Sequence, residues 1–272
     1  MVASSPAVAD QALALIDVTY DVLPAVFDPE AARSPGAPLL HPDRTPADRV
    51  AEAHRNVIAT FHEGFGGDVD AALAAGVPRV VQESVAMVYT DAGDRWIDEE
   101  SPVDHYPIAV GNHAAEASAR RFTDSGGVGV VLRFGLFYGV GAAHSEQLMA
   151  LARRRIGFRA GRPGAYVSSI HLADAADAVV SALEIGSGTY NIVDDLPVTK
   201  KHHTAALAGA VGKHPFVTLP GRAALLLGER TTSLTRSLRM SNRRFRSATD
   251  WRPRYASVWE GYAQMARQLD AA

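Results

Sequence analysis

The chain has 272 residues, 47% of them hydrophobic, so it can bury a core the size of one large domain. Its formal charge of −3 gives no sign of a nucleic-acid or membrane partner. It contains no cysteine, which excludes disulfides, thiolate catalysis and cysteine-based metal sites.

The N-terminal segment, MVASSPAVADQALALIDV, has no basic start and already carries Asp10, which argues against a signal peptide. No apolar run is long enough to span a bilayer. We therefore expect a soluble protein of the cytoplasm.

Strands and helices alternate along the chain, as in a parallel sheet covered by helices. A short helix at 6–15 precedes a strand at 16–23, and residues 29–48, with five prolines, form an irregular excursion. The next predicted elements are helices at 49–64 and 68–77, a Val-rich buried strand at 78–89, a helix at 108–127, a continuous apolar strand at 128–139, a helix at 146–158, a strand and helix within 165–186, and a strand at 188–195. Beyond them the pattern is helical and Arg-rich. It predicts a core at 1–195 and a C-terminal substrate or capping region at 196–272.

Five segments carry recognisable motifs in a fixed order: AALAAGVPRVVQESVAMVY (71–89), VVLRFGLFYGVG (130–141), SSIHLADAADAVVSAL (168–183), GTYNIVDDLPVT (188–199) and RFRSATDWRPRY (244–255). In that order the chain resembles the extended short-chain dehydrogenase/reductase family, the NAD-dependent epimerase/dehydratase group. The resemblance implies an α/β fold, a Rossmann-like parallel sheet sandwiched by helices, with a small, mainly helical C-terminal substrate region.

The match begins near the family's fourth strand, with DVTYDVL at 17–23. Family members open with an earlier strand and a Gly-x-x-Gly-x-x-Gly turn, which brings backbone close to a pyrophosphate. The glycine clusters at 63–67 and 139–144 do not follow a first strand, and we interpret them as turns. We therefore expect a truncated Rossmann-like core and no bound nicotinamide cofactor.

The family's active-site helix is present without its reacting residues. In the family a Tyr is the acid/base, and a Lys lowers its pKa and binds the nicotinamide ribose; the alignment puts Ile108 and Asn112 at these positions. Neither ionises, and no lysine occurs before residue 200 to restore the pair in another register. The family's Ser or Thr falls at Val85. We therefore expect the hydride chemistry of the family to be lost.

Polar residues lie at or just beyond the ends of the predicted strands, where open α/β sheets bind ligands. Candidate catalytic residues are Glu83, Tyr89, His105, Tyr106 and His113. Candidate substrate-binding residues are Ser84, Asn112, Arg133, Tyr138 and His144. Each has a structural alternative: the tyrosines can pack the cleft wall, and the histidines can be surface or packing residues.

Glu83 has its own argument, because a carboxylate in a buried Val-rich strand needs a partner or a raised pKa. That makes it a candidate general base, and the alternative is an ion pair with Arg79 or Arg133. Metal binding is not indicated, since the adjacent His202 and His203 lack helical i, i+4 spacing and no His-Glu-x-x-His motif occurs. The basic stretch 236–254 is interpreted as a capping segment, with binding of an anionic substrate as the alternative.

These patterns lead to one functional hypothesis and two alternatives. The first is an enzyme of specialised small-molecule metabolism that catalyses a non-redox, nicotinamide-independent step such as cyclisation, isomerisation or dehydration. The alternatives are a catalytically inactive metabolite-binding or regulatory protein, and an NAD(P)-dependent epimerase or reductase with relocated catalytic residues. A shortened sheet leaves an open edge, so we expect the N-terminal helices or a second subunit to cover it, the latter as a homodimer.

Overall fold

The structure is a computed structural model, and it describes residues 28–45, 48, 50–57, 69–215, 217–221 and 232–271. The chain divides into two compact units, residues 1–64 and 65–272. The predicted helix at 6–15 and strand at 16–23 lie outside the described residues. In the described part of the chain no helix is long and apolar enough to cross a membrane.

The described part of the first unit contains the short helix α2 (Pro29–Ala32) and the 3-10 turn η2 (Ala53–Arg55). The predicted helix at 49–64 is wrong where it is described, because Glu52 and Val57 form an antiparallel bridge around η2. Asn56 has the left-handed φ of 55°, and its side-chain amide donates to Ala32 O and Pro38 O, both at 2.9 Å. Backbone hydrogen bonds between Glu52 and Val57, in both directions, stand where helical ones were predicted.

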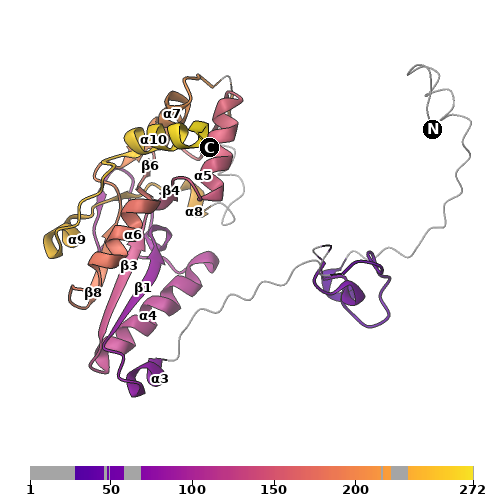
Figure 1. The fold of residues 1–272 in the computed structure, drawn as a ribbon, viewed down its shortest axis with the longest axis horizontal. Coiled ribbons are helices and arrows are strands. Elements are labelled where there is room, and N and C mark those ends of the chain that lie inside the picture. Colours follow the sequence, from indigo (N-terminus) through magenta and orange to yellow (C-terminus); the bar gives the residue numbers. More distant parts are fainter. Residues whose placement is uncertain are drawn as a thin grey trace, which may run out of the picture. The chain divides into compact units, whose positions relative to one another are not determined.

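The second unit contains a three-stranded parallel sheet in the order β1-β3-β8 (Figure 1). The strands are β1 (Arg79–Val85), β3 (Val128–Phe134) and β8 (Gly188–Ile192). Parallel neighbours require crossover connections, which the chain makes through α4 (Val110–Asp124) and α6 (Leu172–Ser181). The predicted α/β fold with a parallel sheet is confirmed.

Helices α4 and α6 cover opposite faces of this sheet. Successive side chains of a strand point to opposite sides, so neighbouring residues of β3 contact different helices. On β3, Leu132 belongs to a buried cluster with residues of α6, whereas Arg133 bonds to Glu116 of α4. At Gly129 of β3, a Cβ atom would lie 2.1 Å from the carbonyl oxygen of Ala119. Only glycine therefore allows α4 to approach the sheet this closely.

A second group of elements gathers beyond the C-terminal ends of the strands, where α7 packs against α5, α10 and β5 (Figure 1). These elements are α5 (Ala143–Arg153), β5 (Ile156–Ala160), α7 (Lys200–Ala210) and α10 (Val258–Ala271). The helix predicted at 146–158 is wrong at its end, because Arg155 has a φ of 61° and β5 follows, pairing with β10 (Val217–Gly221).

The remaining elements are short. They are α3 (Val69–Ala74), η3 (Ala86–Val88), β2 (Trp96–Ile97), η4 (Pro107–Ala109), β4 (Leu136–Tyr138), β6 (Tyr166–Val167), β7 (Ser169–His171), β9 (Val198–Thr199), α8 (Thr232–Thr235), β11 (Arg239–Met240) and α9 (Arg243–Ala248). Strands β9, β10 and β11 show that the segment after residue 196 is less purely helical than its pattern indicates.

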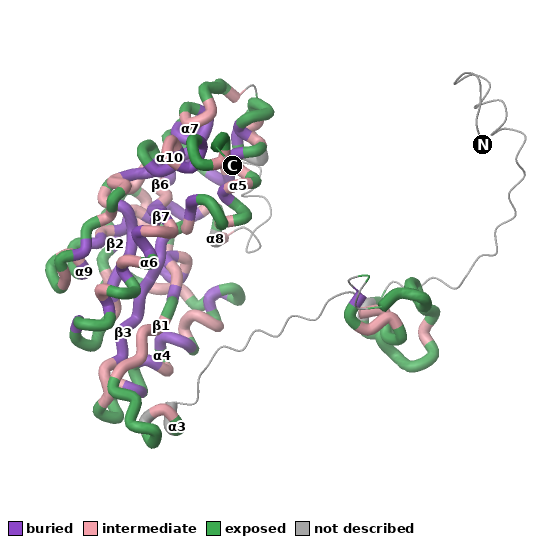
Figure 2. Tube along the Cα trace, viewed as in Figure 1, coloured by how far each residue is buried: buried purple, intermediate pink, exposed green. Residues whose placement is uncertain are grey.

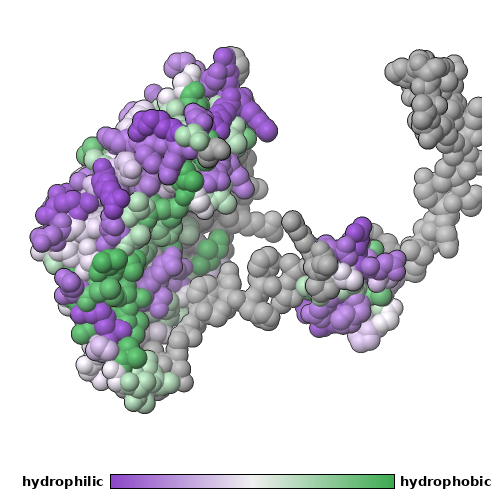
Figure 3. All heavy atoms as spheres, in the orientation of Figure 1, coloured by the Kyte–Doolittle hydropathy of each residue, from purple (hydrophilic) through white to green (hydrophobic). Residues whose placement is uncertain are grey.

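Burial follows this arrangement, with β3 and the inner sides of the helices buried and most of β1 half-buried (Figure 2). One buried cluster joins Tyr138 and Met149 to Leu207 and Tyr262, so it draws on both sides of the predicted boundary between residues 195 and 196. That boundary stays a prediction. Some apolar side chains face solvent: Val180 of α6 and Leu183, just after that helix, are exposed, and Figure 3 shows hydrophobic surface on the face that α6 occupies.

Candidate functional site

A cavity of about 240 Å³ opens where β1 and β3 end. The residues that follow each strand line it, Val85 to Met87 after β1 and Phe134 to Phe137 after β3. Most of its wall is apolar, and Leu148, Phe158 and Leu238 complete it. The cavity occupies the carboxyl edge of a parallel sheet, where the sequence predicted a cleft.

Five of the side chains that line this pocket are of basic residues. Its lining includes His144, Arg159, Lys200, His203 and Arg236, and none of the described lining residues is Asp or Glu. They come from α5, β5, α7 and the segment after α8. Three of these side chains, those of Arg159, Lys200 and Arg236, bring positive charge to a mainly apolar space.

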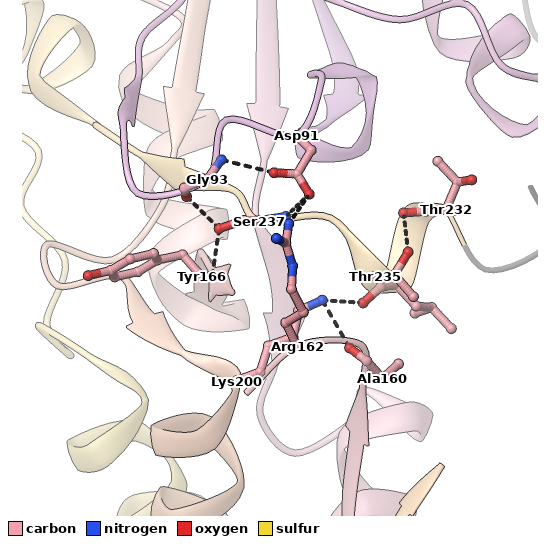
Figure 4. A network of polar contacts seen from close by, with 10 residues as sticks. Asp91, Gly93, Ala160, Arg162, Tyr166, Lys200, Thr232, Thr235 and Ser237 are labelled. Atoms are coloured by element: carbon pink, nitrogen blue, oxygen red, sulfur yellow. Dashed lines mark hydrogen bonds and ion pairs between the residues drawn. The ribbon is translucent and has the colours of Figure 1, made fainter. Parts of the chain in front are cut away.

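Lys200 is the first residue of α7, and the side chain of Thr199 caps this helix by accepting from His202 N. Its Nζ points away from solvent and donates to the carbonyl oxygens of Ala160, at 3.1 Å, and Leu234, at 2.5 Å (Figure 4). Burial lowers the pKa of Lys200 to about 8, with Asp91 opposing this shift and Arg162 adding to it.

A polar network beside Lys200 fixes the segment that carries Arg236 (Figure 4). The carboxylate of Asp91 accepts from Ser237 N, at 3.2 Å, and pairs with Arg162 at 3.5 Å. The Ser237 hydroxyl donates to Gly93 O and accepts from Tyr166 N at 2.9 Å. The loop after η3 is thereby held to the segment after α8, which contributes Arg236 and Leu238 to the pocket wall.

His203 lies one turn after Lys200 on the same side of α7. Its Nε2 is 2.9 Å from the hydroxyl of Tyr262 on α10. Burial lowers the pKa of His203 to about 4, and the charges of His144 and Lys200 add to that effect. The imidazole is therefore neutral at pH 7.

Arg236 joins the pocket to the start of α4. It donates to the carbonyl oxygen of Tyr89 at 2.6 Å, forms an ion pair with Asp104, and lies over the ring of Tyr106 at 4.4 Å. The hydroxyl of Tyr106 donates to Met87 O at 3.0 Å. Both side chains are thus engaged in holding the loops of this region together.

The resemblance puts Val85, Ile108 and Asn112, which are apolar or neutral, at the positions of the family's proton relay. Val85 lines the pocket, Ile108 is 53% exposed before α4, and Asn112 is half-buried on that helix. One turn further along α4, the side chain of Glu116 bonds to Arg133. The described residues therefore do not fit the family's way of holding a nicotinamide ribose.

Of the ten predicted site residues, His144 lines the pocket. Tyr89 and Tyr138 are fully buried, and their hydroxyls donate to Asn191 at 2.8 Å and Asp194 at 3.1 Å. Burial raises the pKa of Tyr89 to about 12, although Arg133 opposes the shift. Both tyrosines are thus packed inside the protein, which was the structural alternative to a role in catalysis or substrate binding.

His105 and His113 lie together outside the pocket lining, with ring centroids 4.1 Å apart. His113 Nε2 is 2.8 Å from the carbonyl oxygen of Asp104, and His105 is exposed. With Tyr106 they form a cluster at the start of α4. Their proposed catalytic roles stay predictions.

The argument for Glu83 is corrected by the structure, because its side chain is exposed on β1 and burial does not force it to find a partner. The buried carboxylate is Glu116, which accepts from Ser84 Oγ at 2.6 Å and from Arg133 Nη2 at 2.7 Å. Ser84 and Arg133 are thus occupied with Glu116, away from the pocket lining. Strand β1 pairs only with β3 among the described residues, which explains the exposure of Glu83.

Sequence reasoning missed Arg159, Lys200, His203 and Arg236. The cap Thr199 marks a helix start, and two lysines and two histidines follow it directly. Which of them turns inward depends on the rotation of α7 against α5 and α10, and no local pattern reveals that rotation. No group of three or more metal-ligating side chains occurs in the part of the chain that the structure describes.

No protein-family model matches the chain. It is 32% identical over 225 residues to a 3-diazoavenalumate denitrifying reductase of Streptomyces sp., covering 79% of this chain and 73% of that protein.

Among solved structures, the human epimerase family protein SDR39U1, with NADPH, superposes with a TM-score of 0.63 at 22% identity, over 70% of this chain and 65% of that one. UDP-glucose 4-epimerase of Thermus thermophilus, with NAD, gives 0.62 at 24% identity, over 75% and 68%. The chain thus spans about two thirds of the length of these proteins, which share its fold. Together with the sequence relative, they place the chain in the extended short-chain dehydrogenase/reductase family of enzymes, the NAD-dependent epimerase/dehydratase group.

Proposed function

We propose that this chain is an enzyme that converts a small, mainly apolar molecule in the pocket beside β1 and β3, without the proton relay of its family. One observation carries the proposal: an apolar pocket with a basic side adjoins Val85, while Ile108 and Asn112 stand at the Tyr and Lys positions. The proposal includes a cytoplasmic location, as the sequence indicates.

The first candidate reaction is a non-redox step that needs no nicotinamide, such as a cyclisation, isomerisation or dehydration. Interconversion of an alcohol and a carbonyl group requires an acid or base at the oxygen, and Ile108 and Asn112 supply none. A rearrangement requires a shaped pocket and one group that moves a proton. His144 and His203 line the pocket and are the candidate proton carriers. Because burial lowers the pKa of His203 to about 4, its neutral imidazole is a weak base at pH 7.

The second candidate is a reduction, and the sequence relative favours it. That protein is named as a denitrifying reductase of 3-diazoavenalumate. Loss of nitrogen from a diazo carbon leaves no alkoxide to be protonated, so a reduction of this type does not require the Tyr–Lys pair. The described residues supply no ribose-binding lysine, and for that reason we derive no step through a nicotinamide.

One assay separates the two candidates. The full chain is incubated with a panel of small aromatic and aliphatic acids, aldehydes, ketones and diazo compounds, each with and without NADH and NADPH, and products are identified by mass spectrometry. Turnover without nicotinamide supports the first candidate. Turnover only with stoichiometric loss of reduced nicotinamide supports the second and overturns the first.

The same panel tests the proposal as a whole. A pocket variant such as His203→Gln is run beside the natural chain, and we expect turnover to fall in the variant if the pocket is the site. Saturable binding of panel compounds without any product, under every cofactor condition, contradicts an enzymatic role. It would instead favour the metabolite-binding protein that the sequence left as an alternative.

A further inference from the structure

The charge of the pocket is unusual for so apolar a cavity. Its five basic lining residues are His144, Arg159, Lys200, His203 and Arg236, and no Asp or Glu balances them in the described lining. A buried cation without an anionic partner is costly. An apolar pocket of this charge is therefore matched by a ligand that brings its own negative charge.

Three of the five basic groups already have partners. Arg236 pairs with Asp104, His203 bonds to the hydroxyl of Tyr262, and His144 Nε2 is 2.5 Å from the carbonyl oxygen of Phe137. Arg159 and Lys200 differ from these, because neither forms an ion pair with any carboxylate among the described residues.

Lys200 has two of its hydrogen-bonding directions occupied by the carbonyl oxygens of Ala160 and Leu234 (Figure 4). An ammonium group has three N–H bonds, so one is left for a ligand. The nearby carboxylate of Asp91 is held by Arg162 and Ser237. It therefore does not neutralise Lys200 directly.

Arg159 precedes Ala160 on β5 and lines the same pocket. Its Nε is buried and has no hydrogen-bond partner among the residues that the structure describes. Buried guanidinium nitrogens are nearly always bonded, so this orphaned donor is a second, independent sign of a missing acceptor. The planar fork of arginine matches a carboxylate in particular.

We infer that Lys200 and Arg159 bind the carboxylate of a small, apolar organic acid, whose body lies against the phenylalanines of the pocket. The inference rests on the proposed function and names its substrate class. The cavity of about 240 Å³ lies below the range of roughly 300–1,000 Å³ that is usual for ligand pockets, which favours a single-ring acid over a nucleotide sugar. Phe134, Phe137 and Phe158 supply the apolar contact.

The test compares two probes of nearly the same shape, trans-cinnamate and its neutral amide, trans-cinnamamide, which replaces the charged carboxylate by an uncharged group. Binding of each to the full chain is measured by isothermal titration calorimetry at pH 7. We expect cinnamate to bind about tenfold more tightly or better, because hydrogen bonds to charged groups are the stronger ones. Equal affinities for the two probes, or no binding of cinnamate, overturn the inference.

Single substitutions then test whether Lys200 and Arg159 bind the carboxylate of cinnamate. In Lys200→Met and in Arg159→Met we expect cinnamate affinity to fall about tenfold, with cinnamamide affinity unchanged. The unchanged binding of cinnamamide shows that each variant is folded and its pocket intact. Lys201→Met is the matched control, since Lys201 is adjacent and exposed, and it should bind both probes like the natural chain.

The pH dependence of cinnamate affinity adds a measurement that would not change if Lys200 had only a structural role. The charged and titratable groups around Lys200 are Asp91, His144, Arg159, Arg162, His203 and Arg236. The ammonium of Lys200 is lost as pH rises through about 8, so cinnamate affinity should fall there in the natural chain and stay level in Lys200→Met.

The two proposals fail separately. If both substitutions leave cinnamate binding unchanged, the substrate class is wrong, while the turnover assay still decides the enzymatic role. If cinnamate binds as expected and no acid in the panel is ever converted, the substrate class stands and the enzymatic role fails.

Discussion

At the scale of single residues, two glutamates on neighbouring elements have opposite surroundings. Glu83 lies on β1 and faces solvent, whereas Glu116 on α4 is 1% exposed and meets Arg133 and Ser84. Burial acts to raise the pKa of Glu116, but hydrogen bonds from Arg133 and Ser84 outweigh it and lower the pKa. Glu116, and not Glu83, is thus the buried carboxylate that requires a charged partner.

The pair of Glu116 and Arg133 gives a stability prediction. We expect Glu116→Ala to lower the free energy of unfolding by about 3–5 kcal/mol, because Arg133 is left as an uncompensated buried charge. Urea denaturation followed by circular dichroism measures this loss. Glu100→Ala is the control, since the exposed pair of Glu100 with Arg244 should be worth about 1 kcal/mol or less. A similar loss in both variants would contradict the argument.

His203 gives a prediction about pH. Its pKa is about 4 in the folded chain, depressed by burial from the ordinary value of 6.5, so the unfolded chain binds the proton first as pH falls. Stability from the neutral imidazole is complete above pH 6.5 and is lost between pH 6.5 and pH 4. Over this window the natural chain should lose about 3 kcal/mol more than His203→Gln.

Urea titrations at several pH values measure the effect of His203. The exposed His202 is the control, and His202→Gln should follow the natural chain throughout. Parallel pH curves for the natural chain and His203→Gln would mean that His203 is not buried in its neutral form.

At the scale of elements, α10 approaches β4 through a glycine. A Cβ atom on Gly261 would lie 2.3 Å from the ring of Tyr138, which is fully buried and hydrogen-bonded to Asp194. The ring cannot withdraw without breaking that bond. The packing of α10 against the core therefore depends on the absence of a side chain at this one position.

We expect Gly261→Ala to destabilise the chain by about 1–3 kcal/mol through overpacking, even though alanine is the better helix former. Gly209→Ala in α7 is the matched control, because nothing lies within 4 Å of its Cβ position. That change should stabilise by roughly 0.5–1 kcal/mol. Thermal unfolding of both variants checks the contrast, and stabilisation in both would contradict the close contact.

At the scale of the whole molecule, the sheet of the second unit has β1 at its edge among the described strands. Unpaired strand edges and exposed apolar side chains, such as Val180 of α6 and Leu183 just after it, favour association. We keep the homodimer as a prediction from these features. Size-exclusion chromatography with light scattering should give twice the chain mass, and a clean monomer over a range of concentrations would contradict it.

We also expect the second unit to fold without the first. Residues 65–272 contain the three-stranded sheet and the three buried clusters of the described core. A protein consisting of residues 65–272 should therefore unfold cooperatively and keep the helical signal of the sheet-covering helices. Circular dichroism during heating measures this, and a broad, non-cooperative transition would show that the first unit is needed.

Much of the fold was readable from the sequence by itself. Periodicity placed β1, α4, β3, α6 and β8 in the right order, because a buried parallel strand is an apolar run and its covering helix repeats every 3.6 residues. The loss of the Tyr–Lys pair was equally visible, since an absent residue type is a fact of composition and alignment.

The pocket's chemistry was decided by tertiary structure. Lys200 and Arg159 lie 41 positions apart, and only the packing of α7 on β5 puts both into one cavity. Glu83 and Glu116 likewise could not be distinguished locally, because burial belongs to the surrounding elements. Sequence determines which groups are available, whereas distance and exclusion of water determine which of them act, and both depend on contacts between distant segments.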